Sequence, residues 1–169
     1  HASVDTEQSD PVFGGEAPQG WGQDVVNLWA ATIVSHASDD LKGQILRDLL
    51  LGNISMCLLY SEPGAGSDAA NIITKAERLG DDFVIKGEKA SITFAGYADA
   101  CIVFARTSEN GARGISAFLV PLDAPGVTRQ PYFATGERLT QRGSLFFDGV
   151  RVPSRNMIGK EGQGFYQAM

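Results

Sequence analysis

The chain has 169 residues, 43% of them hydrophobic, so it can bury the core of one ordinary domain or of two small ones. Its net charge of -6, with no basic cluster, argues against nucleic acid as the main partner. No apolar run is long enough for a membrane span, and we expect no signal peptide. Cys57 and Cys101 stand in apolar runs without metal-ligand spacing, which predicts reduced thiols and a cytoplasmic protein.

The first third of the chain is predicted to be helical after a polar lead-in at residues 1–23. Apolar residues at helical spacing predict one helix over Asp24–His36 and a second one that begins after Ser38, as N-cap, and stops at Gly52. The expected buried faces hold Val25, Leu28, Trp29, Ile33 and Val34 in the first helix and Leu41, Ile45, Leu49 and Leu50 in the second. We interpret His36 as a helix-end or packed side chain, because no second His or Cys lies at ligand spacing.

From residue 54 the apolar pattern changes to the period of β-strands. We expect strands at residues 54–60, 72–78, 83–87, 100–107, 114–122, 127–132 and 144–152, with a hairpin turn at 79–82 and a loop turning into a helix at 162–169. The continuous apolar run at 100–107 is typical of a strand that is covered on both faces. Short strands without room for crossover helices predict an antiparallel barrel or sandwich.

One stretch, residues 60–68, is almost free of bulky side chains where it follows the first strand. Its sequence is Tyr-Ser-Glu-Pro-Gly-Ala-Gly-Ser-Asp. Small residues let a large flat ligand approach the main chain, and the hydroxyls of Ser61 and Ser67 can act as donors. A tight surface turn explains the same composition, so the residues alone leave both interpretations open.

The same stretch contains Gly64-x-Gly66-x-x-Ala69, which satisfies the loose dinucleotide-binding fingerprint. That fingerprint needs a helix to begin at its last glycine, so that the helix N-terminus meets the pyrophosphate. Residues 72–74 are β-branched and precede a hairpin turn, and strands follow instead of alternating βα units. We therefore disfavour a nicotinamide-binding domain. A Walker-type phosphate loop is disfavoured further, because no Lys-Ser or Lys-Thr pair follows the glycines.

Several motifs occur in a fixed order along the chain. They are residues 60–68, the Gly-Glu-Lys-Ala-Ser-Ile-Thr segment at 87–93, Ala-Asp at 98–99, the strand at 114–120, Pro-Gly at 125–126, Gly136-x-Arg138, Phe-Asp-Gly-Val-Arg-Val-Pro at 147–153 and Gly-x-x-Gly-x-Gly-Phe at 159–165. In this order they resemble the acyl-CoA dehydrogenase family from about the second helix onward. The combination is specific, whereas any one motif would be weak.

The resemblance implies a fold class and a division into domains. The family fold is a helical section, a β-barrel and a four-helix bundle. We accordingly expect an α+β chain with a short N-terminal helical section followed by an antiparallel β-barrel. The expected boundaries are residues 1–56 for the partial helical domain, 57–158 for the middle β-barrel domain and 159–169 for the start of an absent C-terminal helical domain.

The resemblance also implies a function. The family uses FAD to remove two hydrogens from an acyl-CoA, with a hydride passing from the β-carbon to flavin N5. Its catalytic carboxylate comes from the bundle, so no residue here is assigned as catalytic and the chain alone is expected to be inactive. Expected partners are the acyl-CoA substrate, electron-transfer flavoprotein as acceptor, and other subunits in a homo- or hetero-oligomer. The alternatives are a non-catalytic binding or partner subunit, and an oxidase or monooxygenase relative.

By the same resemblance, nine residues are expected to contact the cofactor: Leu58, Leu59, Tyr60, Ser61, Gly66, Ser67, Ser91, Ile92 and Thr93. Ser67 is also expected near the CoA arm, and the Thr93 hydroxyl is expected near N5. Read without the family, Thr93 is an ordinary strand residue, and Ser61 and Ser67 cap a turn.

Four charged residues near these motifs are left without chemistry. Glu62 and Asp68 are interpreted as loop carboxylates that serve local N–H groups, and Arg138 and Arg142 stay unassigned. The sequence also departs from the family where Ser91 replaces a tryptophan and Phe94 replaces an asparagine. Losing the indole removes an apolar wall, so either Phe94 or another chain fills that space, or the flavin is held more loosely.

Overall fold

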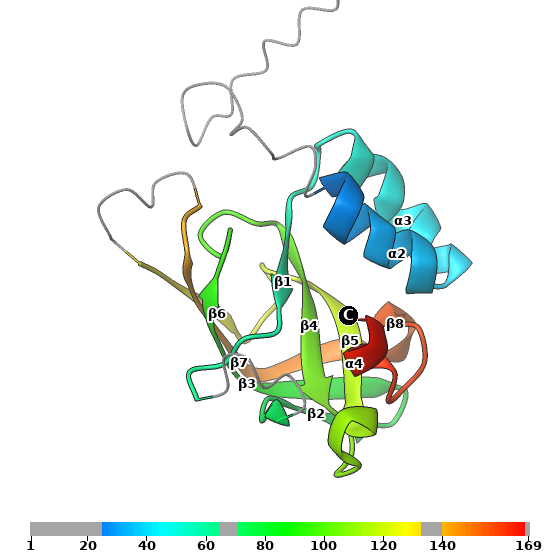
Figure 1. Ribbon diagram of the computed structural model, residues 1–169, viewed down its shortest axis with the longest axis vertical. Helices are drawn as coiled ribbons and strands as arrows, with labels where there is room; N and C mark the ends of the chain where they lie inside the picture. Colours follow the sequence, from blue (N-terminus) through cyan, green and yellow to red (C-terminus); the bar gives the residue numbers. More distant parts are fainter. Residues whose placement is uncertain (1–24, 65–70, 133–139, 168–169) are drawn as a thin grey trace, which may run out of the picture.

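The computed structural model describes residues 25–64, 71–132 and 140–167 of the chain (Figure 1). Its helical section consists of a π-helical segment η1 (Val25–Ala30), α2 (Ala31–His36) and α3 (Asp39–Leu50). No helix in these ranges is long and apolar enough to cross a bilayer. The first predicted helix is thus confirmed as a helical region, but its first half is wound more loosely than an α-helix.

Both ends of α3 form as the sequence predicts. The hydroxyl of Ser38 accepts a hydrogen bond from the amide of Leu41 at 3.3 Å, so Ser38 is the N-cap. At the other end, Gly52 has φ +74°, its amide donates to the carbonyl of Leu49, and the amide of Asn53 donates to the carbonyl of Asp48. This pair of bonds is a Schellman motif, which needs the left-handed conformation that glycine adopts easily.

The buried faces of the helices are narrower than the apolar pattern predicts. Ile33 is buried in α2, and Leu41, Ile45 and Leu49 are buried in α3. The prediction was wrong for Leu28, Val34 and Leu50, which are all about half exposed. Each of the three lies one residue from a buried position, and one residue turns a helix by about 100°. The side chain of Val25 lies outside the described part of the structure.

Within the described ranges, eight strands form one sheet. They are β1 (Met56–Leu59), β2 (Lys75–Leu79), β3 (Asp82–Ile92), β4 (Ala100–Arg106), β5 (Ile115–Pro121), β6 (Val127–Pro131), β7 (Gly143–Pro153) and β8 (Met157–Ile158). The strand order is β6-β7-β3-β2-β4-β5-β8, and β1 pairs with β4. The described chain also contains the 3₁₀ turns η3 (Gly111–Gly114) and η4 (Ser154–Asn156) and a short helix α4 (Gly164–Gln167).

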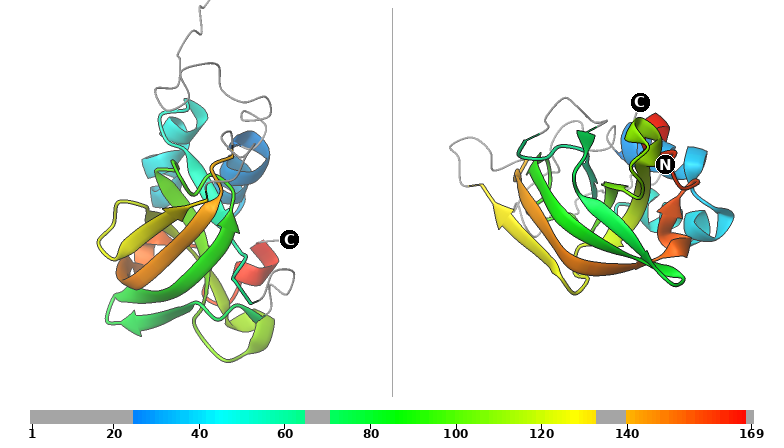
Figure 2. Two further views of the ribbon diagram at one scale, coloured as in Figure 1. Left: turned by 90° about the vertical axis from the view of Figure 1, so that its left-hand side faces the viewer. Right: turned by 90° about the horizontal axis from the view of Figure 1, so that it is seen from below.

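The sheet is mostly antiparallel and strongly curved, as the predicted α+β class requires (Figure 2). Two pairings are parallel instead, β1 with β4 and the start of β2 with the end of β4. The outermost strands of the order, β6 and β8, do not pair with each other within the described ranges. The barrel is therefore open. The predicted helix-then-barrel order is confirmed, whereas the three domain boundaries stay a prediction.

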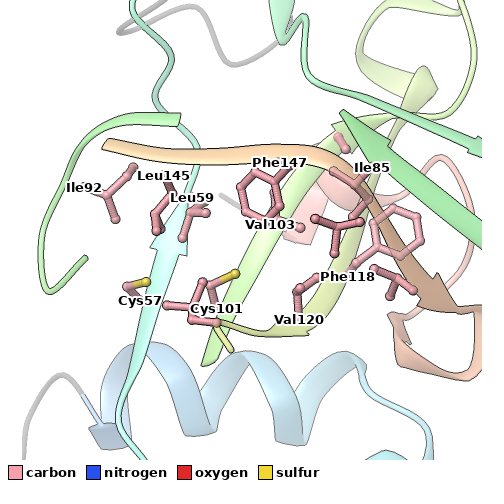
Figure 3. Close-up of a cluster of buried hydrophobic side chains, with 14 of the residues drawn as sticks. Cys57, Leu59, Ile85, Ile92, Cys101, Val103, Phe118, Val120, Leu145 and Phe147 are labelled. Atoms are coloured by element: carbon pink, nitrogen blue, oxygen red, sulfur yellow. The ribbon is translucent and has the colours of Figure 1, made fainter. Parts of the chain in front are cut away.

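The curved sheet separates two apolar clusters. The inner cluster fills the barrel and includes Cys57, Leu59 and Phe118, and Figure 3 shows these side chains converging between the strands while the helix lies outside. The outer cluster joins the helices to β1, β4 and β5 and includes Trp29 and Ile33. Because β4 has an apolar cluster on each side, six of its seven residues are buried, which confirms the prediction for this strand.

Candidate functional site

The described part of the side-chain-poor bend, residues 60–64, lies against the last part of β3. The amide of Ala90 donates a hydrogen bond to the carbonyl of Ser61 at 3.1 Å, and Lys89 Nζ lies 3.4 Å from the carbonyl of Tyr60. The first predicted cofactor segment and the one at residues 91–93 are therefore neighbours in space. Gly66, Ser67 and Asp68 fall in 65–70, and Gly136 and Arg138 fall in 133–139, so these five residues lie outside the described ranges.

A fully buried ion pair fixes the bend to the strand. Lys89 Nζ lies 2.8 Å from Glu62 Oε1, and both side chains have no exposed surface. The carboxylate also accepts hydrogen bonds from the amides of Ile73, at 2.8 Å, and Thr74, at 3.0 Å. Glu62 thus ties together the bend, β3 and the segment that enters β2. The expectation that this carboxylate serves N–H groups is confirmed, but the prediction that these groups are local was wrong, because the two amides are 11 and 12 residues away.

The pair stays ionised because each partner compensates the burial of the other. Burial raises the pKa of Glu62, but the charge of Lys89 and hydrogen bonds from Lys89, Thr74 and Ile73 outweigh burial and hold that pKa below its ordinary value. Burial lowers the pKa of Lys89 to about 8, and the carboxylate of Glu62 opposes that fall. The arrangement holds backbone in place and leaves neither group exposed for proton transfer with a ligand.

The residues that lead into the bend use their side chains for packing. Leu59 has no exposed surface and belongs to the inner cluster, so only its backbone can face a ligand. Leu58 and Tyr60 pack against the outer cluster, on the opposite side of the strand. The ring of Tyr60 stacks on Phe104 with 4.4 Å between centroids, and burial raises the pKa of its hydroxyl. Within the described part of the bend, the backbone of residues 61–64 is therefore the surface that a flat ligand can approach.

The end of β3 departs from regular strand geometry at the predicted cofactor residues. Its register with β7 shifts between Lys89 and Ile92, and Ser91 has φ +58°. Phe94 follows with φ +70°. A left-handed conformation at a residue other than glycine costs about 1–2 kcal/mol and needs surrounding contacts to persist. Such strain is concentrated at ligand sites, which fits the function expected for this segment.

The bulge decides which side chains face outward. Ile92 is buried in the inner cluster, whereas Ser91 and Thr93 are exposed. Among the described residues, no group forms a hydrogen bond with the hydroxyl or the amide of Thr93. A Cβ added to Gly64 on the neighbouring bend would meet nothing within 4 Å. Free donors beside an open, side-chain-poor backbone fit the flat, acceptor-rich ring of a flavin.

The ring of Phe94 is committed to packing. It meets the ring of Trp29 edge-on at 5.8 Å and lies 5.4 Å from the ring of Tyr97. Of the two candidates for the space left by a tryptophan at position 91, Phe94 is therefore already held by the outer cluster. An exposed aromatic side chain beside Ser91 is that of Tyr132. Its hydroxyl accepts a hydrogen bond from the Ser91 amide at 3.3 Å.

Sequence reasoning missed two participants, Lys89 and Tyr132. A signal for Lys89 was present, because it continues the inward phase of Phe83 and Ile85 along β3. A lysine at an inward position needs a buried acid, and Glu62 in the neighbouring motif was the candidate. No comparable signal existed for Tyr132, which lies just after β6 and 41 residues beyond Ser91 in the chain.

Comparison with known proteins points to one family. The family model described as "Acyl-CoA dehydrogenase, middle domain" matches residues 57–150, more than half of the chain. Short-chain specific acyl-CoA dehydrogenase from Rattus norvegicus mitochondria is 38% identical over 145 residues, which cover 85% of this chain and 35% of that relative. The chain spans about a third of the length of the curated relatives it matches.

Two solved structures share the fold closely. An acyl-CoA dehydrogenase from Geobacillus kaustophilus has a TM-score of 0.81 and 35% identity, and the match covers 89% of this chain and 40% of that one. A structure described as a FAD-dependent dehydrogenase has a TM-score of 0.81 and 32% identity, covering 87% and 41%. Together with the family model, these matches confirm the resemblance: the chain belongs to the acyl-CoA dehydrogenase family, whose members are FAD-dependent oxidoreductases.

Proposed function

We propose that this chain supplies the flavin-facing barrel of an enzyme that dehydrogenates an acyl-CoA thioester between its α- and β-carbons. The observation that carries the proposal is the contact between the bend and the end of β3, where Ala90 bonds Ser61 and the Glu62–Lys89 pair locks both segments. The catalytic carboxylate is proposed to come from a helical section outside these residues, so the chain by itself is proposed to be inactive.

FAD, when bound, supplies the chemistry by accepting a hydride from the substrate's β-carbon at ring nitrogen N5. The chain's own residues hold the ring and exclude water. We assign the Thr93 hydroxyl and the exposed backbone after Tyr60 as donors toward the ring, with Ser91 at its edge. Gly66 and Ser67 are proposed to complete the cradle, and Ser67 to approach the CoA arm. The support is the family membership together with the open donors described above.

The proposed partners follow from this chemistry. A dehydrogenase must pass on two electrons after each turnover, so a second flavoprotein of the electron-transfer type is proposed as the acceptor. The half-exposed apolar residues Leu28, Val34 and Leu50 on the helices support assembly with further protein in a homo- or hetero-oligomer. Cys57 and Cys101 are free and buried, which supports a reducing compartment, and we propose the cytoplasm.

Flavin content and substrate-dependent bleaching test the proposal. The protein is purified in the full length that its gene encodes, its absorption spectrum is recorded, and butyryl-CoA, octanoyl-CoA and palmitoyl-CoA are added without oxygen. We expect about one FAD per chain and bleaching by at least one thioester. Absence of flavin would favour the alternative of a non-catalytic binding or partner subunit. Rapid reoxidation of the reduced flavin by oxygen would indicate an oxidase or monooxygenase instead.

A substitution at Thr93 tests the assigned donor. Thr93→Val keeps the side-chain shape and removes the hydroxyl, so we expect FAD to remain bound while the bleaching rate falls about 100-fold. Thr128→Val is the matched control, because Thr128 is an exposed strand residue on β6. Equal bleaching rates in the two variants would contradict the role of the Thr93 hydroxyl and leave the family-level proposal standing.

A further inference from the structure

Tyr132 reaches the site from the edge of the sheet, where β6 is the outermost strand. It directly follows β6, and its amide donates to the carbonyl of Arg142 at 2.7 Å, which extends the pairing of β6 with β7. Its side chain then reaches β3, where its hydroxyl oxygen accepts the Ser91 amide at 3.3 Å. The same oxygen lies 2.9 Å from the hydroxyl of Ser144 on β7. One phenol thus connects three strands at the point where β3 is irregular.

The segment at residues 140–142 holds the same irregular stretch from beside it. The amide of Phe94 donates to the carbonyl of Thr140 at 2.7 Å, and the amide of Gly96 donates to the carbonyl of Gln141 at 3.0 Å. The guanidinium of Arg142 lies 3.4 Å from the Ser91 carbonyl. Both backbone groups of Ser91 are therefore held by side chains, its amide by Tyr132 and its carbonyl by Arg142.

Between these bonds lies Thr93, whose hydroxyl and amide have no partner among the described residues. Thr93 lies in the turn that directly follows β3, so its direction depends on the backbone conformation of the bulge at Ser91. If Ser91 relaxed to an extended conformation, the residues after it would shift and Thr93 would no longer be presented in the same way. A bond that holds the Ser91 amide therefore controls where the Thr93 hydroxyl points.

We propose that Tyr132 is a positioning residue of the flavin site, whose hydroxyl clamps the Ser91 bulge and so aims Thr93 at the cofactor. The inference rests on the proposed function, and it adds the residue that follows β6 to a site otherwise built from the bend and β3. Tyr132 is 38% exposed, and its side chain lies beside Ser91. Its hydrogen bonds with the Ser144 hydroxyl and the Ser91 amide lower the pKa of the phenol.

Tyr132→Phe tests the clamp, because it removes the hydroxyl and keeps the ring. The protein in its full encoded length is followed by deuterium exchange in the peptide that covers residues 90–96, without added FAD. We expect exchange in Tyr132→Phe to be at least tenfold faster than in the wild type. Ser144→Ala removes the second partner and is expected to give a smaller increase in the same peptide. Tyr166→Phe is the control, since Tyr166 is 57% exposed on α4 and belongs to another part of the surface.

A second readout separates positioning from a merely structural bond. With FAD bound, we expect acyl-CoA to bleach the Tyr132→Phe variant about tenfold more slowly than the wild type. The Tyr166→Phe variant is expected to bleach at the wild-type rate. Unchanged exchange in Tyr132→Phe overturns the clamp. Faster exchange with an unchanged bleaching rate overturns the positioning role. If the wild-type protein binds no FAD, the proposed function is overturned, and the positioning role with it. If the wild-type protein binds FAD but Tyr132→Phe matches it in exchange rate or in bleaching rate, only the inference about Tyr132 is overturned.

Discussion

Strand β4 and the end of β3 belong to one sheet, with β2 between the two strands, but they differ in what determines their sequence. β4 pairs with β5 through seven consecutive residue pairs without a register shift, and its side chains are apolar up to Arg106. The end of β3 has a register shift, a buried lysine and a left-handed serine within a few residues. β4 serves as scaffold, so packing alone decides its sequence. The local sequence does not predict the conformation at the end of β3, because contacts from distant segments hold a conformation that the strand would not adopt alone.

The difference lies in what each segment depends on. The residues of β4 are stabilised by apolar surface on both sides, and such packing tolerates small changes of shape. The end of β3 depends on a few polar contacts with defined partners, Glu62 for Lys89 and Tyr132 for Ser91. Removing one partner of the buried Glu62–Lys89 pair leaves the other one unsatisfied, so this contact is individually important.

The largest expected effect is that of breaking the buried ion pair. Lys89→Met leaves the Glu62 carboxylate buried without its counter-charge, so we expect the free energy of unfolding to fall by about 3–5 kcal/mol. Lys86→Met on the exposed side of the same strand is the control, and it is expected to change stability by less than about 0.5 kcal/mol. Urea unfolding of the three proteins measures both values. Similar stabilities for the two variants would mean that the pair does not hold the bend.

A smaller effect is expected on the acid side of the pH profile. The pKa of Glu62 is lower in the folded chain than in the unfolded chain, so its carboxylate stabilises the fold above pH 4.5 and loses this effect as pH falls through the folded pKa. We expect about 2 kcal/mol to be lost in this way, the size of hydrogen bonds to a charged group. Thermal unfolding from pH 6 to pH 3 measures the loss.

Two variants identify the group responsible for that acid dependence. Glu62→Gln cannot titrate, so its stability should fall less steeply with acid than that of the wild type. Glu77→Gln, which removes an exposed carboxylate on β2, should keep the wild-type slope. If Glu62→Gln retains the full slope, the acid sensitivity comes from other carboxylates and not from the buried pair.

The sequence predicted what local pattern controls. The serine cap and the glycine stop of α3, the hairpin before β3 and the doubly covered β4 all follow from neighbouring residues, and each is confirmed. Local pattern does not reveal which strands pair. β1 joins β4 in parallel with Met56 opposite Ala100, and nothing within either run indicates this partner.

For the candidate site, motif order located the two segments that meet, but not the contacts that hold them. A left-handed Ser91 has no sequence signal, because serine gives no indication of a positive φ. The clamp from Tyr132 depends on how β6 and β7 lie across β3, which is a property of the whole sheet. The helix faces were overpredicted at Leu28, Val34 and Leu50 because an apolar residue beside a buried position is also common on surfaces.

The smallest expected effect is that of glycine substitutions, which should change the free energy of unfolding in opposite directions in β3 and β4. Ser91→Gly relieves the cost of a left-handed serine, about 1–2 kcal/mol, and loses part of that gain because glycine makes the unfolded chain more flexible, so we expect a net stabilisation of up to about 1 kcal/mol. Ala105→Gly, in the regular and buried part of β4, should instead destabilise by about 1 kcal/mol. Chemical denaturation with matched slopes gives both numbers. If both substitutions destabilise equally, Ser91 is not strained in solution, and the end of β3 would then be a strand like β4 in which no clamp is needed.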